Sequence, residues 1–425
     1  MPPEILSEIF VCTQPLPADP AGPPMLQTRW RLSQVGRRWR EIALSTPSLW
    51  SLVYVSGKRQ ADPLPMVQAQ VQRARDLKIH FYGAQNGTGD ATARIKLFTF
   101  LSEHSVRWEE LFLRLTAELV PLLPPFRGRL PSLRRLSIIW HDERSQIGVD
   151  SVECFETAPF LEDVEFSSEF RYTPIPFPTD LLTSYRIQGS LESHQHILQM
   201  APNIIEARVA ITYGLDQPWP EPIGPTIDML HLKRLYVTHV EILDYFRAPS
   251  LEEISINLNL VSKDENPVEH LDAFFLRSSC TPWRFCVEDL PDIGVTEEIL
   301  KKYTSITSIG FEFISESDEA VYAHLSMLAK TPVAFPHLSE IRFGSNVFRS
   351  SPPFDYPFFL KMLQSRRSSI STAASIARKG PGPDPKTADA LNALRQAGMS
   401  IFIAGADGTW HARQWTYKTP WVFLE

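Results

Sequence analysis

Two histidines and two cysteines are the residues of this chain whose spacing comes nearest to metal chemistry. His194 and His196 are separated by one residue, and Cys280 and Cys286 are six positions apart. Structural zinc sites need four Cys or His ligands, usually supplied as two close pairs. Neither pair here has a second pair nearby. The sequence therefore predicts surface histidines and free thiols, with no metal and no cofactor.

Motifs for catalysis are also missing from the sequence. It contains no G-x-S-x-G, no H-E-x-x-H and no phosphate loop, and Gly87-Thr88-Gly89 lacks the third glycine of a dinucleotide-binding motif. Glu252 and Glu253 occupy neighbouring positions of an expected strand, so their side chains face opposite sides and form no acid–base couple. We therefore expect a protein that is not an enzyme.

The composition limits the class of protein and its compartment. The 425 residues carry a net charge of −7, which argues against general nucleic-acid binding. No run of about 18 apolar residues is present, which argues against a membrane span, and the N-terminus lacks the basic region of a signal peptide. The four cysteines are widely scattered, as in a protein of a reducing compartment. We expect cytoplasmic or nuclear localisation.

A repeated pattern occupies the middle of the chain and must position any functional surface. It reads P-x-L-x-x-h-x-h, where h is apolar, and its fullest copies begin at Pro131, Pro159, Pro202, Pro249 and Pro336. The alternation at the end of each copy predicts a strand with one buried face. From residue 108 to residue 338 the copies are about 26 residues apart, within the range of roughly 20–29 residues for leucine-rich repeats. The expected strands are 111–113, 136–138, 164–166, 185–187, 207–209, 235–237, 254–256, 309–311 and 341–343.

These strands and the helix-like segments between them predict an α/β fold with one parallel sheet. The segment 57–350 resembles an irregular leucine-rich-repeat solenoid, although most copies lack the Asn or Cys that this family usually carries after the strand. A solenoid of this kind would present the residues between the h positions on a curved inner face. The residues expected there, and therefore the candidates for target binding, are Ser137, Glu165, Arg208, Tyr236, Ser255 and Arg342.

The first 56 residues predict a small helical module. An apolar face that includes Ile5 and Ile9 indicates one helix, and a second amphipathic helix is expected from Trp30 to Leu44. A proline-rich loop, Pro15 to Pro24, separates them. Residues 1–60 carry a net charge of +3 and the remainder −10, which suggests an acidic partner for the module.

Three sequence blocks of this module resemble an F-box of the kind found in mushroom-forming fungi. They are the run from Met1 to Phe10, the run from Leu32 to Ala43, and Pro47-Ser48-Leu49-Trp50. The sequence departs from the family at Met1, where Leu is usual, and at Gly36, where Cys is frequent. The resemblance implies binding to a Skp1-type adaptor and, through it, to a cullin ubiquitin ligase. The contact residues that it implies are Pro2, Ile5, Leu6, Ile9, Val35 and Trp39.

The C-terminal part, residues 351–425, is expected to form a capping repeat. Residues 354–366 read as a helix, and residues 367–386, rich in Ser, Pro, Gly and Ala, as a mobile loop. A helix over 387–397 is expected to have Thr387 as its N-cap and Gly398 just after its end. A strand at 401–403 and a hairpin turn at Asp407-Gly408 are expected to follow.

Two functions are compatible with this organisation. One is an adaptor that holds a target protein on its repeats and delivers it to an SCF-type ubiquitin ligase. The other is a ubiquitin-independent interaction scaffold, in which the F-box serves only as a folding cap. The exposure of Ile5, Ile9, Val35 and Trp39 distinguishes them, because a cap would bury these side chains against the repeats.

Overall fold

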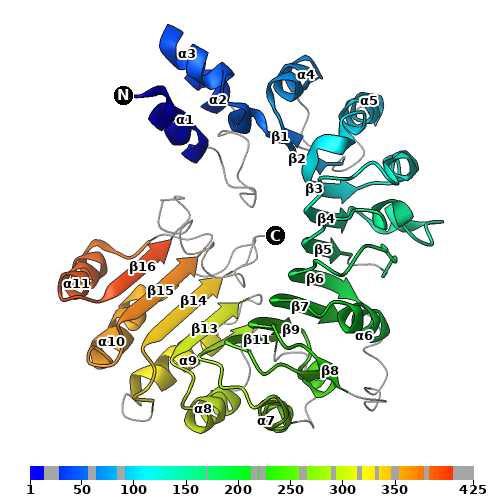
Figure 1. Ribbon diagram of the computed structural model, residues 1–425. Coiled ribbons are helices and arrows are strands. Elements are labelled where there is room, and N and C mark those ends of the chain that lie inside the picture. The colour runs from blue at the N-terminus through cyan, green and yellow to red at the C-terminus, as the bar shows by residue number, and fades with distance from the viewer. Residues whose placement is uncertain are drawn as a thin grey trace. The chain divides into compact units, whose positions relative to one another are not determined.

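The computed structural model describes residues 1–13, 28–55, 64–83, 91–168, 171–211, 219, 226–257, 266–288, 293–313, 318–330, 335–345, 354–377 and 382–404. These residues belong to two compact units: unit 1 is built around Met1–Ile204, and unit 2 around Ile205–Ala210 and Gln217–Leu424. The boundary falls inside the segment 57–350 that the sequence predicts as one body. Both units are α/β and contain parallel strands (Figure 1).

Unit 1 begins with the helical module, which consists of α1 (Pro3–Cys12), α2 (Thr28–Leu32), α3 (Arg37–Leu44) and the 3₁₀ turn η2 (Pro47–Trp50). The prediction of one helix from Trp30 to Leu44 is therefore wrong, because this segment is divided between α2 and α3. The Ser33 hydroxyl donates to the Trp30 carbonyl (2.7 Å) at the end of α2. Gly36 is extended and precedes α3, in keeping with the weak helix propensity of glycine.

The sheet of unit 1 runs in chain order, and its described strand pairs are all parallel. Helices α4 (Leu64–Arg73) and α5 (Ala91–Ser102) connect its first strands, and the 3₁₀ turn η3 (Ser105–Arg107) follows α5. The next two connections contain 3₁₀ turns, which are η4 (Val120–Leu122) and η5 (Pro124–Phe126) between β3 and β4, and η6 (Glu143–Gln146) and η7 (Glu153–Phe155) between β4 and β5. Helix α6 (Leu191–Met200) follows the last strand. The strands are β1 (Leu52–Val55), β2 (Leu77–Tyr82), β3 (Trp108–Leu115), β4 (Arg135–Trp140), β5 (Asp163–Ser167) and β6 (Ser184–Gly189).

Unit 2 repeats this arrangement with longer helical connections. Its strands lie in the order β7-β9-β11-β12-β13-β14-β15-β16, and the short strands β8 (Ile227–Asp228) and β10 (Phe246–Arg247) pair separately. The connections include the 3₁₀ helix η8 (Val240–Tyr245), α7 (Pro267–Ser278), α8 (Ile293–Lys302), α9 (Asp318–Lys330), α10 (Tyr356–Ser365) and α11 (Pro385–Gln396). The strands are β7 (Glu206–Ile211), β9 (Arg234–Val237), β11 (Glu253–Asn257), β12 (Arg284–Glu288), β13 (Ser308–Phe313), β14 (Glu340–Ser345), β15 (Thr372–Ala377) and β16 (Ser400–Ala404).

The repeat pattern accounts for the buried core. Leu133, Leu136 and Ile138 of one copy are all almost fully buried, as the alternation requires. The connecting helices lie against this apolar face of the strands in each unit, and no described helix following a strand covers the other face, which we call the helix-free face (Figure 1). All nine predicted strands lie within observed strands, and neighbouring strands pair in parallel in each unit.

Backbone hydrogen bonds join the residues that precede neighbouring strands. The Glu162 amide donates to the Arg134 carbonyl (2.8 Å), and the Thr183 amide donates to the Glu162 carbonyl (2.9 Å). Ser339, Ser371 and Ser400 continue the same ladder in unit 2. These backbone groups thus have partners.

Two expectations for the C-terminal part are wrong. Residues 372–377, which lie in the predicted mobile loop 367–386, form β15 and pair with both β14 and β16. The N-cap of α11 is Asp384, whose carboxylate accepts the Thr387 amide (3.1 Å), so Thr387 lies inside the helix. Gly398 has the expected left-handed conformation after the helix. The predicted hairpin at Asp407-Gly408 lies outside the described residues.

Candidate protein-interaction surfaces

The residues that came nearest to metal chemistry do not form a site. The prediction of a surface histidine is wrong for His194, which is fully buried with its Nδ1 bonded to the Tyr185 hydroxyl (2.6 Å), whereas His196 is exposed as predicted. No group of three potential metal ligands occurs among the described residues. Glu252 is exposed beside Lys233 (2.8 Å), while Glu253 is buried and pairs with Arg284 (2.9 Å). Gly87-Thr88-Gly89 lies outside the described residues.

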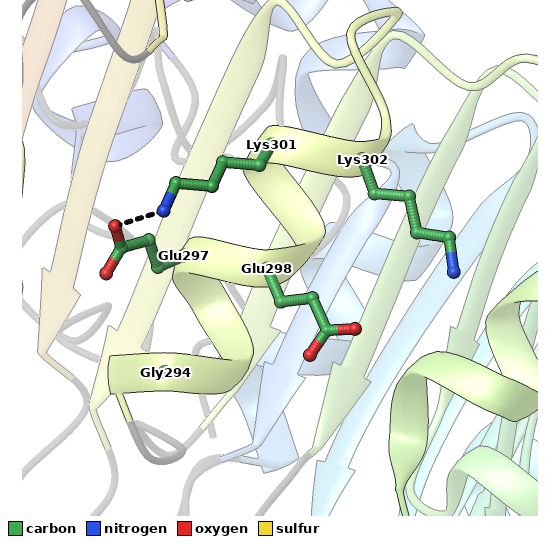
Figure 2. Close-up of a pocket in the computed structure, with 5 residues that line it drawn as sticks. All are labelled: Gly294, Glu297, Glu298, Lys301 and Lys302. Carbon is green, nitrogen blue, oxygen red and sulfur yellow. Dashed lines mark ion pairs between the residues drawn. The ribbon is translucent and has the colours of Figure 1, made fainter.

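A hollow on helix α8 does not have the lining of a small-molecule site either. Figure 2 shows that its walls are the side chains of one helix surface, and the Lys301 ammonium pairs with the Glu297 carboxylate at 2.7 Å. Lys302 pairs with Asp272 on α7. Ligand pockets are mostly apolar with a few converging polar groups, whereas this hollow is lined by Gly294, Glu297, Glu298, Lys301 and Lys302.

The helical module presents an apolar surface on the residues that the F-box resemblance implies. Ile5, Ile9 and Val35 are 50%, 43% and 63% exposed, and Pro2 is also exposed. Leu44, which the sequence reasoning did not select, is 41% exposed. Ile5 and Ile9 are one turn apart on α1 and therefore lie on the same side of that helix, where exposed apolar side chains can contact a partner.

The two remaining residues of that set have structural roles. Leu6 is buried within the module, which makes it a core residue rather than a contact residue. Trp39 is half-buried, and its ring lies 5.0 Å from the ring of the fully buried Phe10. This contact, together with the hydrogen bond from Arg38 to the Met1 carbonyl, holds α1 beside α3.

Basic side chains accompany this apolar surface. Arg31, Arg37, Arg38 and Arg40 are all exposed. Arg37 pairs with Glu41 on the same helix (3.0 Å). The module thus exposes four arginines, consistent with the positive charge that the sequence assigns to it.

A different set of residues joins the module to β1. Arg29, almost fully buried, donates to the Leu52 carbonyl (2.7 Å), and Gln70 Nε2 donates to the Trp50 carbonyl (3.0 Å) as well as to Leu52. The Arg73 guanidinium lies over the rings of both Trp30 and Trp50. Burial lowers the pKa of Arg29 to about 10. The sequence did not indicate a role for Arg29, Gln70 or Arg73, since nothing in their spacing marks them.

The predicted target-binding residues lie on the helix-free face but differ in their exposure to solvent. Ser137 and Glu165 are register partners in unit 1, half-buried, with the Ser137 hydroxyl donating to Glu165 (3.1 Å). In unit 2, Arg208, Tyr236 and Ser255 also occupy one row of register partners.

The expectation that Tyr236 and Ser255 are exposed is wrong, because each is only 3% exposed. Tyr236 bonds to Glu288, and the Arg208 guanidinium lies over the Tyr236 ring at 4.6 Å. Both faces of β11 are buried, and the alternation of apolar and polar residues in its sequence did not indicate this.

Charged residues of unit 2 form a ladder on the same face. Arg284 pairs with Glu253 (2.9 Å) and lies 3.5 Å from Glu340. The Glu340 carboxylate also accepts the Ser308 hydroxyl (2.6 Å) and pairs with Arg342. Burial opposes ionisation of Glu340, but the Ser308 hydrogen bond and the two arginines together lower its pKa. Arg342 is therefore engaged within the fold rather than open to a target.

Comparison with protein-family models and with curated proteins found no match. In the described part of the chain, every helix is too short or too polar to cross a bilayer.

Proposed function

We propose that this chain is a substrate-recognition adaptor of an SCF-type ubiquitin ligase in the cytosol or nucleus. The helical module binds a Skp1-type adaptor, which links it to a cullin ligase, and the repeat body binds a target protein. The body then resembles an irregular leucine-rich-repeat solenoid in function as well as in its sequence pattern. No catalysis, cofactor or nucleic acid is part of this function.

The observation that supports this proposal best is the exposure of Ile5, Ile9 and Val35. A folding cap would bury these side chains against the repeats, whereas the module is anchored through a separate set, which includes Arg29 and Trp50. These exposed apolar side chains and the exposed arginines of the module are thus left for a partner. An acidic partner with an apolar groove would satisfy both features.

A pull-down with the Skp1 homologue of the host tests the proposal. Val35→Asp should abolish capture, because an interface would bury the new carboxylate without a partner. Val106→Asp is the matched control, since Val106 is also an exposed valine of unit 1, at 46%, but lies in η3. Capture of neither the wild type nor the control, alongside a positive control that binds, would contradict the proposal.

The contacts that anchor the module also favour the alternative function, a ubiquitin-independent scaffold. Arg29 of the module donates to the Leu52 carbonyl of β1 (2.7 Å), and the Arg73 guanidinium of α4 lies over the ring of the fully buried Trp50, so the module packs on the start of the body. If the module served only as a cap, deleting residues 1–50 would destabilise the body, and intact protein would fail to capture the adaptor. Val35→Asp would then change neither stability nor partners.

A further inference from the structure

Three aromatic side chains lie together on the helix-free face of unit 1. The rings of Tyr54 and Tyr82 are 5.2 Å apart, and those of Tyr82 and Phe112 are 4.9 Å apart. Arg114 is the register partner of Tyr82, and Ile139 is the register partner of Arg114. All five are half-buried, and together they form what we call the aromatic cluster. It extends across β1, β2, β3 and β4.

Arg114 differs from the other arginines of this face. Arg135 lies 3.5 Å from Glu110, and Arg186 pairs with Asp163 at 2.8 Å. The guanidinium of Arg114 has no carboxylate within ion-pair distance among the described residues. It is therefore a partly desolvated cation at the edge of an aromatic surface, where a carboxylate from outside would form a charge-assisted hydrogen bond.

Tyr82 lies beside this cation, and its hydroxyl is hydrogen-bonded to Tyr54. Burial, followed by the neighbouring Tyr54, raises the pKa of Tyr82 to about 12, although Arg114 lowers it. The phenol is consequently protonated at neutral pH. The aromatic cluster thus combines apolar rings, an aliphatic side chain, a phenol and a cation, the residue types that dominate the binding energy of protein interfaces.

The size of the cluster fits a short length of extended chain. Adjacent strands are about 4.8 Å apart, so four strands span roughly 15 Å, the length of four or five extended residues. The corresponding face of unit 2 offers no equivalent surface at Tyr236 and Ser255, which are buried, or at Arg284 and Glu253, which pair with each other.

We propose that the aromatic cluster binds an extended segment of a partner protein that carries a carboxylate next to an apolar side chain. The carboxylate would lie against Arg114, and the apolar side chain would pack on Phe112 and Ile139. This inference rests on the proposed function, because it names the chemistry of the target that the body holds. It also moves the target site from the six predicted strand residues to this cluster.

Selection of displayed random dodecapeptides on the full-length chain tests the inference. Enriched peptides should carry Asp or Glu within two positions of Leu, Ile, Phe or Trp. Fluorescence anisotropy with one enriched peptide then gives Kd for each variant. Arg114→Glu should weaken binding roughly tenfold to a hundredfold, since a hydrogen bond between charged groups is lost and replaced by repulsion.

Arg75→Glu is the matched control. Arg75 is an exposed arginine of unit 1 that precedes β2, whereas Tyr82 is at the end of β2, which puts the two roughly 20 Å apart along the chain. Its Kd should stay within twofold of the wild type. A peptide whose acidic residue is changed to Lys should bind the Arg114→Glu variant better than it binds the wild type.

Three results would overturn the inference. In the first, no peptide binds the wild type more tightly than it binds Arg114→Glu. In the second, the enriched peptides lack acidic residues. In the third, Arg75→Glu weakens peptide binding as much as Arg114→Glu does. Light scattering tests whether a second copy of this chain occupies the cluster. A dimer of the wild type that dissociates in the Arg114→Glu variant would also overturn the inference. Adaptor capture, measured in parallel, separates the two proposals, because Arg114→Glu should retain it and Val35→Asp should retain peptide binding.

Discussion

Replacing Arg29 by Met is expected to leave the protein equally stable or more stable, although Arg29 lies in the joint between the helical module and β1. Its guanidinium donates to the Leu52 carbonyl at 2.7 Å. No carboxylate among the described residues forms an ion pair with it. Burial is the cause that lowers its pKa to about 10. A buried cation without a counter-ion is costly for the folded state.

The magnitude follows from two opposing contributions. The lowering of the pKa from its ordinary value to about 10 corresponds to about 3 kcal/mol against the charged form in the folded state. Loss of a hydrogen bond from a charged donor costs about 1.5–3 kcal/mol. The Leu52 carbonyl keeps a donor, because Gln70 Nε2 also bonds to it. Met also keeps an unbranched apolar stem, so the net change lies between zero and about 1.5 kcal/mol of stabilisation.

Urea unfolding followed by tryptophan fluorescence measures this change, since Trp30 and Trp50 pack against each other in the same joint. Gln70→Leu is the informative comparison, because it removes the donor that the Trp50 and Leu52 carbonyls share. It should destabilise by about 1–3 kcal/mol. If Arg29→Met instead destabilises by more than about 1 kcal/mol while Gln70→Leu is neutral, the reasoning about the unpaired charge is wrong.

Three further predictions concern the core, a helix end and a buried histidine. Leu6→Ala should lower the free energy of unfolding by about 2–4 kcal/mol, since Leu6 is buried, whereas Ile5→Ala at an exposed position should change it little; urea titration compares them. Gly398→Ala should cost about 1–2 kcal/mol, because φ is +98° there, and thermal unfolding would show it against Gly382→Ala, which has no such φ. Burial lowers the pKa of His239 to about 4, so the folded chain binds this proton less readily than the unfolded chain. Unfolding free energy should therefore fall as the pH decreases from about 6.5 to 4, by about 1–3 kcal/mol, and His239→Phe should flatten that part of the pH profile.

Strand positions were predictable because each copy of the repeat carries its own signal. Leu136 and Ile138, for example, alternate with Ser137, and only one register puts both apolar residues on the buried face. Helix boundaries were less predictable. Ser33 and Gly36 interrupt an apolar pattern that is otherwise continuous from Trp30 to Leu44, and the periodicity of the neighbours masked the break.

Strand β15 shows where local reading fails. Thr372-Ala373-Ala374-Ser375 is small and weakly apolar, with a composition typical of a loop. It forms a strand because β14 and β16 supply partners on both sides, and tertiary context overrides propensity. The burial of Tyr236 and Ser255 has a similar origin, since it depends on what covers the helix-free face rather than on the alternation within β9 or β11.

The two candidate surfaces also differ in whether the sequence could predict them. Ile5, Ile9 and Val35 could be selected from sequence because the F-box resemblance assigns them a role, and the exposed fraction of each agrees with that role. The aromatic cluster could not, because Tyr54, Tyr82 and Phe112 come from three separate copies. Their adjacency depends on the register of β1, β2 and β3.

Strand β1 gives the two proposed binding surfaces a fixed relation within unit 1. The Leu52 carbonyl accepts from Arg29, which anchors the helical module, and Tyr54, two residues later in the same strand, belongs to the aromatic cluster. Two residues of a strand span about 7 Å. On the proposed function, a target held at the cluster and an adaptor bound to the module are therefore positioned by a paired strand rather than by a flexible linker. A Gly–Ser insertion between Ser51 and Leu52 should leave both binding affinities intact while lowering ubiquitin transfer to the bound target.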